Sequence, residues 1–498
     1  MTANPPVQTT DLPVLILGAG FSGIGMGIKL KQAGIENFTI LERADEVGGT
    51  WRDNSYPGAG CDVHSHLYSF SFEPNPDWSR AFSGWKEILE YIKDITDKHN
   101  LRPHIKFNKE VVRAEFDEQK GLWTVETADG ETYVARAVVS AAGGLANPAY
   151  PKIPGLDKFK GKLIHTARWD HDYDLKGKRV GMIGSGASAI QAGPHIAQDA
   201  EQLSVFQRTP HWIIPKPDRE ISGLEKTLFD KVPGLLKMRR WVLYWMYEAR
   251  GPVIISDKPW LKKIGQTMAL RHMHKQLKDP ELRRACTPDY LIGCKRILIS
   301  NDWYPMLERE NVSLETDGIE RITENGIVLK NGEERELDAI ILATGFQISI
   351  SNAPFKIIGR NEQGLDKAWE GGAEAYKGVT VSGFPNLFFM LGPNTGPGHN
   401  SVLVYTEMQI EYALQAIKML RDDDLKFLDV KQDVQDEFNE EIQGRMENTV
   451  WTSGCNSWYL SEDGKNSTLY PGLNMEYRIR TRKLKTSEYD TERQTESA

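Results

Sequence analysis

Residues 12–33 read LPVLILGAGFSGIGMGIKLKQA, and this stretch decides how the N-terminal part of the chain folds. It opens with an apolar run, Val14 to Leu17, that has the length and composition of a buried strand. A G-x-G-x-x-G turn follows, and apolar residues then recur at helical spacing; the turn glycines are Gly18, Gly20 and Gly23. Such glycines let the backbone bend tightly and approach a pyrophosphate, whose charge is favoured at the helix N-terminus. The stretch therefore predicts a strand, turn and helix that bind a dinucleotide.

The strand after this helix identifies the dinucleotide. Residues 38–41 form a second apolar run that ends in Glu42, 19 residues beyond Gly23. An acid at this position hydrogen-bonds the hydroxyls of an unphosphorylated ribose. FAD is therefore the expected ligand of the first turn. The alternative is that Glu42 is an ordinary charge at a strand end.

A second glycine turn lies farther along the chain and is followed by a different strand end. The strand expected at 179–183 leads into GSGASA at 184–189, a G-x-G-x-x-A variant of the same turn. The next strand, 203–206, ends without an acid, in Gln207, Arg208 and Thr209. Because a cation accommodates a 2′-phosphate, Arg208 and Thr209 predict NADPH in preference to NADH. The candidate contacts within the turn are Gly184, Ser185, Gly186 and Ser188.

Two further segments carry a family resemblance. The segment ahead of the second turn, FKGKLIHTARWD at 159–170, has the form F-x-G-x-x-x-H-x-x-x-W-D. The segment at 48–62 contains G-G-x-W, then Y-P-G, then Asp62 four residues after the glycine of Y-P-G, Gly58. Both resemble signatures of the type I Baeyer-Villiger monooxygenases, flavoenzymes that use NADPH and O2 to insert an oxygen atom beside a ketone carbonyl. Apart from 216–288 and the tails, the resemblance spans nearly the whole chain.

The resemblance implies roles for particular residues. Asp62 and Arg296 are the implied catalytic pair, and Lys295 supports the NADP phosphate. A permanently charged guanidinium stabilises the anion of a flavin C4a-peroxide without offering an easily transferred proton. Further implied cofactor contacts are Gly49, Trp51, Tyr68 and Trp458, and the implied interdomain fingerprint is Phe159, Gly161, His165 and Trp169.

Each of these roles has a structural alternative. Trp51 and Trp458 are alternatively packing residues, and Asp62 is alternatively the cap of a turn. The adjacent Lys295 and Arg296 are alternatively an ordinary surface pair. For the whole protein, the nearer alternative is a flavin monooxygenase that oxygenates nitrogen or sulfur, and the other is an NADPH:flavin reductase that makes no oxygenated product. Trp169-Asp170 and the pair Asp62 and Arg296 favour conversion of ketones to esters or lactones.

The motifs predict an α/β fold with two Rossmann-like dinucleotide-binding domains, one for FAD and one for NADPH, and a mainly helical insertion. The FAD domain is expected at 8–147 and 345–498, and the NADPH domain at 148–215 and 289–344. The insertion is expected at 216–288, and flexible tails at 1–7 and 486–498.

Composition limits the remaining possibilities. A net charge of −8 over 498 residues argues against a nucleic-acid partner. Four cysteines, Cys61, Cys286, Cys294 and Cys455, show no C-x-x-C pattern, which predicts reduced thiols in a cytoplasmic protein. The histidine pairs at 64/66 and 272/274 lack zinc partners, so no metal is expected.

No membrane span or signal peptide is expected. The first eleven residues are polar and contain proline. The apolar stretch 235–247 includes three basic residues and is too short to cross a bilayer. It predicts an amphipathic helix over the substrate tunnel or core, with contact to a membrane surface as the alternative.

Overall fold

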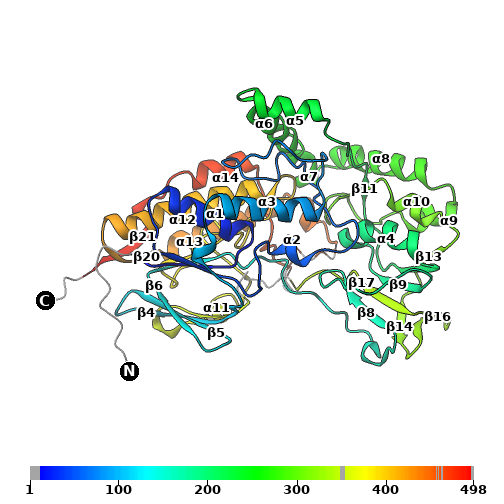
Figure 1. The fold of residues 1–498 in the computed structure, drawn as a ribbon, viewed down its shortest axis with the longest axis horizontal. Coiled ribbons are helices and arrows are strands. Elements are labelled where there is room, and N and C mark those ends of the chain that lie inside the picture. The colour runs from blue at the N-terminus through cyan, green and yellow to red at the C-terminus, as the bar shows by residue number, and fades with distance from the viewer. Residues whose placement is uncertain (1–11, 348–353, 456, 458, 461–463, 495–498) are drawn as a thin grey trace.

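Two parallel sheets of five strands each organise the molecule (Figure 1). The computed structural model describes residues 12–347, 354–455, 457, 459–460 and 464–494. The first sheet has the order β19-β7-β1-β2-β3, with bounds Leu387–Phe389, Ala137–Ser140, Val14–Leu17, Phe38–Leu41 and Ile105–Lys106. The second has the order β13-β10-β9-β17-β8, with bounds Val312–Glu315, Gln202–Phe206, Arg179–Ile183, Ala339–Leu342 and Lys162–His165. Each glycine turn follows a central strand, β1 or β9, which confirms the predicted pair of Rossmann-like units.

The first sheet is buried on both faces because its central strand is apolar at every position. Val14 and Ile16 lie on the face that packs with helices. One of these helices is α1 (Phe21–Gln32), which follows the turn. Leu15 and Leu17 pack on the other side against a four-stranded sheet. That sheet has the order β18-β4-β5-β6, with bounds Lys356–Ile358, Val111–Asp117, Leu122–Thr127 and Thr132–Ala135.

The second sheet repeats this layering. Val180 and Met182 of β9 pack with the helix after the turn, α4 (Ala187–Asp199), and with α10 (Trp303–Leu307). Ile183 packs on the opposite face with the apolar residues of a three-stranded antiparallel sheet. Its strands are β14 (Ile319–Ile322), β15 (Gly326–Leu329) and β16 (Glu334–Glu336).

Helices from distant parts of the sequence cover the first sheet. Helix α3 (Trp85–Lys98) buries Ile88, Ile92 and Ile95 on one face and leaves its charged residues outside. Helix α12 (Val402–Asp422) packs beside α1, and the hydroxyl of its N-cap residue, Ser401, accepts a hydrogen bond from the Leu403 amide at 3.3 Å. The remaining helices of this half are α2 (Thr50–Asp53), α11 (Leu365–Ala368), α13 (Gln432–Met446) and α14 (Asn474–Thr481).

The expected insertion is helical. It contains α5 (Gly223–Lys231), α6 (Leu235–Glu248), α7 (Gly251–Ile255), α8 (Pro259–Gln276) and α9 (Pro280–Ala285). A short parallel pair of strands, β11 (Ile213–Ile214) and β12 (Leu298–Ile299), flanks it. Figure 1 shows α5, α6 and α8 along one edge of the molecule, opposite β4, β5 and β14. None of the described helices combines the length and the hydropathy that a bilayer-spanning helix needs.

The C-terminal tail is more ordered than its polar sequence predicts. We expected flexibility from residue 486, but β21 (Tyr489–Arg493) pairs antiparallel with β20 (Leu425–Val430). The side chain of Tyr489 is buried, and its hydroxyl lies 2.9 Å from that of Tyr412. One buried aromatic residue and backbone pairing therefore hold a strand whose other side chains are exposed. The tail expected at 1–7 and residues 495–498 lie outside the described residues.

Candidate active site

The first glycine of each turn occupies a position that a residue with a side chain could take only with strain. Gly18 has φ +109° and Gly184 has φ +119°. A Cβ atom on Gly18 would lie 2.6 Å from the carbonyl oxygen of Ala141, and one on Gly184 would lie 2.4 Å from that of Ala343. In both turns the backbone therefore bends against the end of the neighbouring strand, where a side chain does not fit.

Both turns end in a helix N-terminus that can receive an anion. The N-cap residues are Gly20 for α1 and Gly186 for α4, and neither helix has a side-chain cap or an acid in its first turn. A Cβ atom on Gly186 would meet no atom within 4 Å, and one on Gly20 would meet only the Gly49 Cα, at 3.7 Å. The backbone N–H groups of both helices are thus approachable, which fits the pyrophosphate of a dinucleotide.

The two turns differ at their third small residue. A Cβ on Gly23 would lie 1.8 Å from the carbonyl oxygen of Gly18, so α1 packs directly on its turn. The second turn has Ala189 at the corresponding place, and this side chain is fully buried. The expected G-x-G-x-x-G and G-x-G-x-x-A patterns therefore correspond to a closer and a slightly looser packing of helix on strand.

Glu42 lies at the end of β2 and is 4% exposed. Its carboxylate accepts hydrogen bonds from the Ala19 amide at 2.8 Å, the Ala44 amide at 3.0 Å and the Arg52 guanidinium at 3.0 Å. A carboxylate has about four acceptor positions, so one remains for a ribose hydroxyl. The Ala19 contact fixes Glu42 against the first turn. Its role as a ribose-binding acid stays a prediction.

The G-G-x-W segment lies behind the first turn. Gly49 has φ +52°, and a Cβ atom there would lie 3.1 Å from the Cα of Gly20. The Trp51 indole N–H donates to the Tyr68 hydroxyl at 3.1 Å. The Tyr68 ring packs edge-on against Phe21, the first residue of α1, with centroids 5.5 Å apart, and burial raises the pKa of Tyr68. These three expected cofactor residues therefore form one layer with the turn.

The Y-P-G segment docks on the helix of the second turn. The Tyr56 hydroxyl donates to the Gln191 side chain at 2.8 Å, and the Gln191 amide donates to the Gly60 carbonyl at 3.0 Å. Burial raises the pKa of Tyr56 to about 12, and the Ser188 side chain partly offsets this rise. Gly58 has φ +78°, and a Cβ atom there would lie 2.4 Å from the Gln191 carbonyl oxygen. Gln191 could not be singled out from local sequence patterns, because its partners are more than 130 residues away along the chain.

This docking brings Asp62 to Arg296. The guanidinium donates from Nε at 3.1 Å and from Nη2 at 2.5 Å to the same carboxylate oxygen, Oδ2. The charge of Asp62 raises the pKa of Arg296 further above its ordinary value. The Arg296 side chain remains 48% exposed, so part of its surface is available to a bound molecule. Tyr459 lies within electrostatic range of both residues, and burial raises its pKa to about 12.

The residues expected at the 2′-phosphate line one cavity of about 590 Å³. Arg208, Thr209 and Lys295 all border it, and the Ser185 hydroxyl donates to the Thr209 carbonyl at 3.1 Å. Burial, and secondly the charge of Arg208, lower the pKa of Lys295. Within the described part of the chain, neither Arg208 nor Lys295 forms an ion pair with a carboxylate. The carboxylate of Asp289 lines the same cavity and partly offsets the charge of Lys295. Two cations against one carboxylate leave the cavity suited to a multiply charged anion.

His165 lies where the chain crosses between the two sheets. The two crossing segments pair with each other: the Ala149 amide donates to Gly345 at 2.9 Å, and Pro148 and Phe346 form an isolated bridge. The Nδ1 atom of His165 accepts from the Ala167 amide at 3.1 Å, and Nε2 lies 3.4 Å from the Thr344 hydroxyl. Burial lowers the pKa of His165. The imidazole thus ties the end of β8 to the return crossing.

The other fingerprint residues support the same strand. A Cβ atom on Gly161 would lie 2.6 Å from the Asp338 carbonyl oxygen, so glycine lets β8 approach β17. Phe159 packs with the apolar cluster between the second sheet and β14–β15. Trp169 packs on the opposite face, against the cluster that contains α4.

Comparisons with known proteins identify the family. A family model for pyridine nucleotide-disulphide oxidoreductases matches residues 15–233. A Baeyer-Villiger monooxygenase of Pseudomonas aeruginosa is 48% identical over 98% of this chain and 93% of its own length. The chain belongs to the Baeyer-Villiger monooxygenases. The structure of oxidized steroid monooxygenase bound to NADP is similar, with TM-score 0.87, 30% identity and coverage of 97% of this chain and 100% of that one. OTEMO in complex with FAD and NADP also has TM-score 0.87, with 26% identity and the same coverage.

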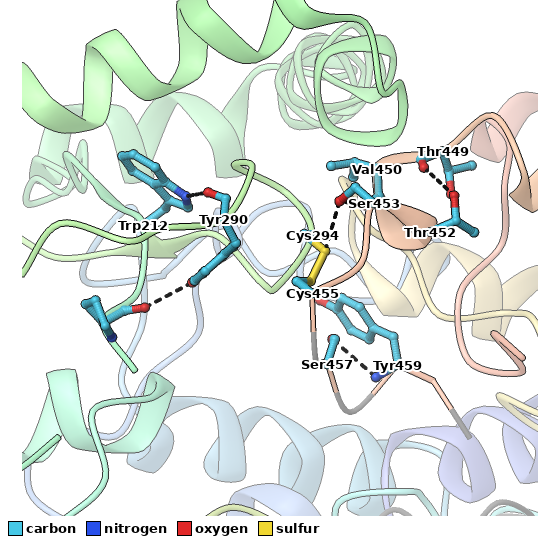
Figure 2. Close-up of a disulfide and its surroundings, with 11 residues drawn as sticks. Trp212, Tyr290, Cys294, Thr449, Val450, Thr452, Ser453, Cys455, Ser457 and Tyr459 are labelled. Carbon is cyan, nitrogen blue, oxygen red and sulfur yellow. Dashed lines mark hydrogen bonds between the residues drawn. A yellow bond between two sulfur atoms is a disulfide. The ribbon is translucent and has the colours of Figure 1, made fainter. Parts of the chain in front are cut away.

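The monooxygenase contains one feature that contradicts the sequence-based expectation. Cys294 and Cys455 form a disulfide, with their Cα atoms 6.3 Å apart (Figure 2). It joins the loop that carries Lys295 to the segment 453–455, and the Ser453 hydroxyl donates to Cys294 Sγ at 3.3 Å. The prediction of four reduced thiols is therefore wrong for this pair, because a spacing rule detects only local pairs and these are 161 residues apart. Cys61 and Cys286 are free and buried. Trp458 lies outside the described residues.

Proposed function

We propose that this Baeyer-Villiger monooxygenase uses FAD and NADPH to convert ketones to esters or lactones at the Arg296–Asp62 pair. The contact between these residues carries the proposal. Asp62 comes from the segment behind the first turn, and Arg296 from the loop that also supplies Lys295 to the cation-lined cavity. One ion pair thereby joins the surroundings of both cofactor sites.

The chain's own residues support both cofactors. The first turn, with Gly18, Gly20, Gly23 and Glu42, would hold FAD, and Gly49, Trp51 and Tyr68 would support it from behind. The second turn, with Gly184, Ser185, Gly186 and Ser188, would hold NADPH, and its 2′-phosphate would contact Arg208, Thr209 and Lys295. When bound, NADPH supplies a hydride to FAD, and the reduced flavin supplies the electrons that activate O2.

Arg296 would stabilise negative charge on the oxygen that is transferred. Its guanidinium stays charged at any working pH, and Asp62 fixes its plane through two N–H donors. Because the donors are already oriented, little reorganisation is needed as charge develops. Arg296 is therefore suited to stabilise an oxygen anion without protonating it.

The paired crossings support the expected domain boundaries. The Gln347 amide donates to the Asn147 carbonyl at 2.9 Å, so the outgoing and returning segments meet beside residues 147 and 345. On this basis the FAD-binding domain comprises 8–147 and 345–498, and the NADPH-binding domain 148–215 and 289–344. His165 at this crossing would hold the arrangement of the two domains, with Phe159, Gly161 and Trp169 supporting β8.

Product analysis tests the reaction. The purified holoenzyme is incubated with NADPH, isotopically labelled O2 and a panel of linear, cyclic and aryl ketones, with a thioether in parallel. An ester or lactone that contains one labelled oxygen atom is expected. A sulfoxide without any ester would replace ketone oxygenation by sulfur oxygenation. NADPH oxidation without an oxygenated product would identify a reductase instead.

A further inference from the structure

The helical insertion carries most of the exposed large apolar side chains among the described residues. Seventeen large apolar side chains are exposed among the described residues, and ten of them lie between 216 and 288. Scattered exposed apolar residues are ordinary, but a concentration in one element indicates a surface that binds a partner. The ten are Leu224, Leu228, Val232, Met238, Trp241, Val242, Trp245, Trp260, Ile264 and Met268.

Helix α6 presents an apolar stripe to solvent. Its exposed residues Met238, Trp241, Val242 and Trp245 recur at the spacing of one helical face, and Trp241 is 62% exposed. The rings of Trp241 and Trp245 lie 6.3 Å apart in an edge-to-face arrangement. Leu243 and Tyr247 are buried on the opposite face. This helix is therefore apolar on both faces, although only one of them packs against the protein.

Helix α8 repeats the pattern and adds cations. Trp260, Ile264 and Met268 are exposed at intervals of four residues, with Trp260 63% exposed. They border a cavity of about 880 Å³, which is also lined by Lys263, Arg271 and Lys275. Among the described residues, none of these three cations has an ion-pair partner. Unpaired cations beside exposed indoles are typical of protein surfaces that bind at the lipid–water interface.

The charge of this segment opposes that of the whole chain. Residues 222–278 contain twelve Lys and Arg against four Asp and Glu, which gives a net charge of +8. The chain as a whole carries −8, so the remaining residues carry −16. A negatively charged surface would therefore attract the insertion and repel the rest of the molecule, which orients the protein on approach.

We infer that α5, α6 and α8 form a lipid-docking face that binds peripherally to bilayers containing anionic lipids. The three helices lie along one edge of the molecule (Figure 1). The exposed tryptophans and aliphatic residues enter the headgroup region, and Lys263, Arg271 and Lys275 pair with lipid phosphates or carboxylates. The inference rests on exposure and charge alone and does not depend on the proposed reaction.

Vesicle co-sedimentation of the full-length holoenzyme tests the lipid-docking face. The vesicles contain phosphatidylcholine alone, or phosphatidylcholine mixed with phosphatidylglycerol. We expect binding to the mixed vesicles that weakens as salt concentration rises. The variants Trp241→Ser/Trp245→Ser and Lys263→Glu/Arg271→Glu/Lys275→Glu should each lower the partition coefficient about tenfold or more. Flavin content and melting temperature of the variants should match those of the parent.

Matched controls separate this face from general surface effects. Ile479→Ser removes an apolar side chain that is 69% exposed on α14, outside the insertion, and Lys356→Glu reverses an exposed charge on β18. Both controls should retain binding. The inference is overturned if the holoenzyme binds neither vesicle, or if the controls lose binding as much as the insertion variants. It is also overturned if a concentration-dependent dimer protects Trp241 and Trp245 from a soluble fluorescence quencher, because a second copy would then occupy the face.

Discussion

The first and second dinucleotide turns have nearly the same backbone, although they lie in different sheets. Their first glycines have φ +109° and +119°, and both N-cap glycines have φ within 2° of each other, at −82° and −80°. In the first sheet, β1 lies between β2, which follows α1, and β7, which ends beside the turn. In the second sheet, β9 lies between β10, which follows α4, and β17, which ends beside the turn. The carbonyl oxygens of Ala141 and Ala343 leave no space for a Cβ atom on the first glycine of either turn.

The two units differ at the end of the second strand. Glu42 is buried and accepts hydrogen bonds from the turn itself, which leaves it suited to a neutral ribose. At the matching place Gln207 is buried and donates to the Ala285 carbonyl at 3.0 Å, while Arg208 turns toward the cation-lined cavity. Sterics therefore set the backbone of both turns, and we expect the residues at the next strand end to select the nucleotide.

Substitution of Arg296, whose ion pair with Asp62 joins the two units, should show the largest effect on activity. Arg296→Ala should lower ester formation by about 100-fold or more, because an oriented cation at developing charge is lost. NADPH should still reduce FAD, since reduction requires only correct hydride geometry. Product chromatography and anaerobic flavin reduction measure the two steps separately.

Arg296→Lys distinguishes orientation from charge alone. An ammonium group lacks the planar pair of donors that now contacts Asp62, so ester yield should stay low and hydrogen peroxide should accumulate. Ester yield near the parent level in Arg296→Ala would remove this residue from the mechanism.

Substituting the first glycine of each turn should separate the two cofactors. Gly18→Ala should lose FAD, whereas Gly184→Ala should retain FAD but be reduced slowly by NADPH. Each Cβ would meet a backbone oxygen that cannot move aside, so each variant should lose about 3 kcal/mol of unfolding free energy. Flavin absorbance, reduction rate and denaturant unfolding measure these effects.

Gly34→Ala and Gly177→Ala are the matched controls. Both glycines have positive φ, at +70° and +67°, but a Cβ atom on either would meet nothing within 4 Å. Each control variant should lose only about 1 kcal/mol of unfolding free energy, the ordinary cost of placing alanine at a positive φ. Equal losses in all four variants would mean that the steric account of the turns is incorrect.

The sequence predicted what local patterns encode and missed what distant segments create. Both glycine turns, Glu42 and Arg208 follow from spacing along one βαβ unit, so they were predictable. The docking of Tyr56 on Gln191 and the disulfide of Cys294 with Cys455 depend on segments more than 130 residues apart. The strand at Tyr489–Arg493 was missed because its polar composition resembles a solvated tail, and only tertiary pairing with β20 reveals it.

The strand end after the second turn should control the choice of coenzyme. Arg208→Ala should raise KM for NADPH about 10- to 100-fold, the equivalent of one lost charge-assisted hydrogen bond, and leave KM for NADH unchanged. Arg309→Ala is a suitable control, because Arg309 is an exposed cation of the same half whose guanidinium donates to the Asn311 side chain at 3.1 Å. Equal loss with both coenzymes would exclude Arg208 as a phosphate contact.

Substitution of His165, which lies at the crossing between the units, should have the smallest effect on cofactor binding and a moderate effect on turnover. His165→Ala removes the contacts with the Ala167 amide and the Thr344 hydroxyl, so the two paired crossings lose a common support. Couplings of this kind typically amount to about 0.5–2 kcal/mol, which corresponds to a fall in kcat of about 2- to 30-fold. FAD content and KM for NADPH should stay at the parent level, because His165 contacts neither glycine turn. His274→Ala on α8 is the control, since this histidine is exposed and distant in the chain from both crossings. A variant that lost flavin but turned over normally after reconstitution would contradict the coupling role and would assign His165 to the FAD site instead.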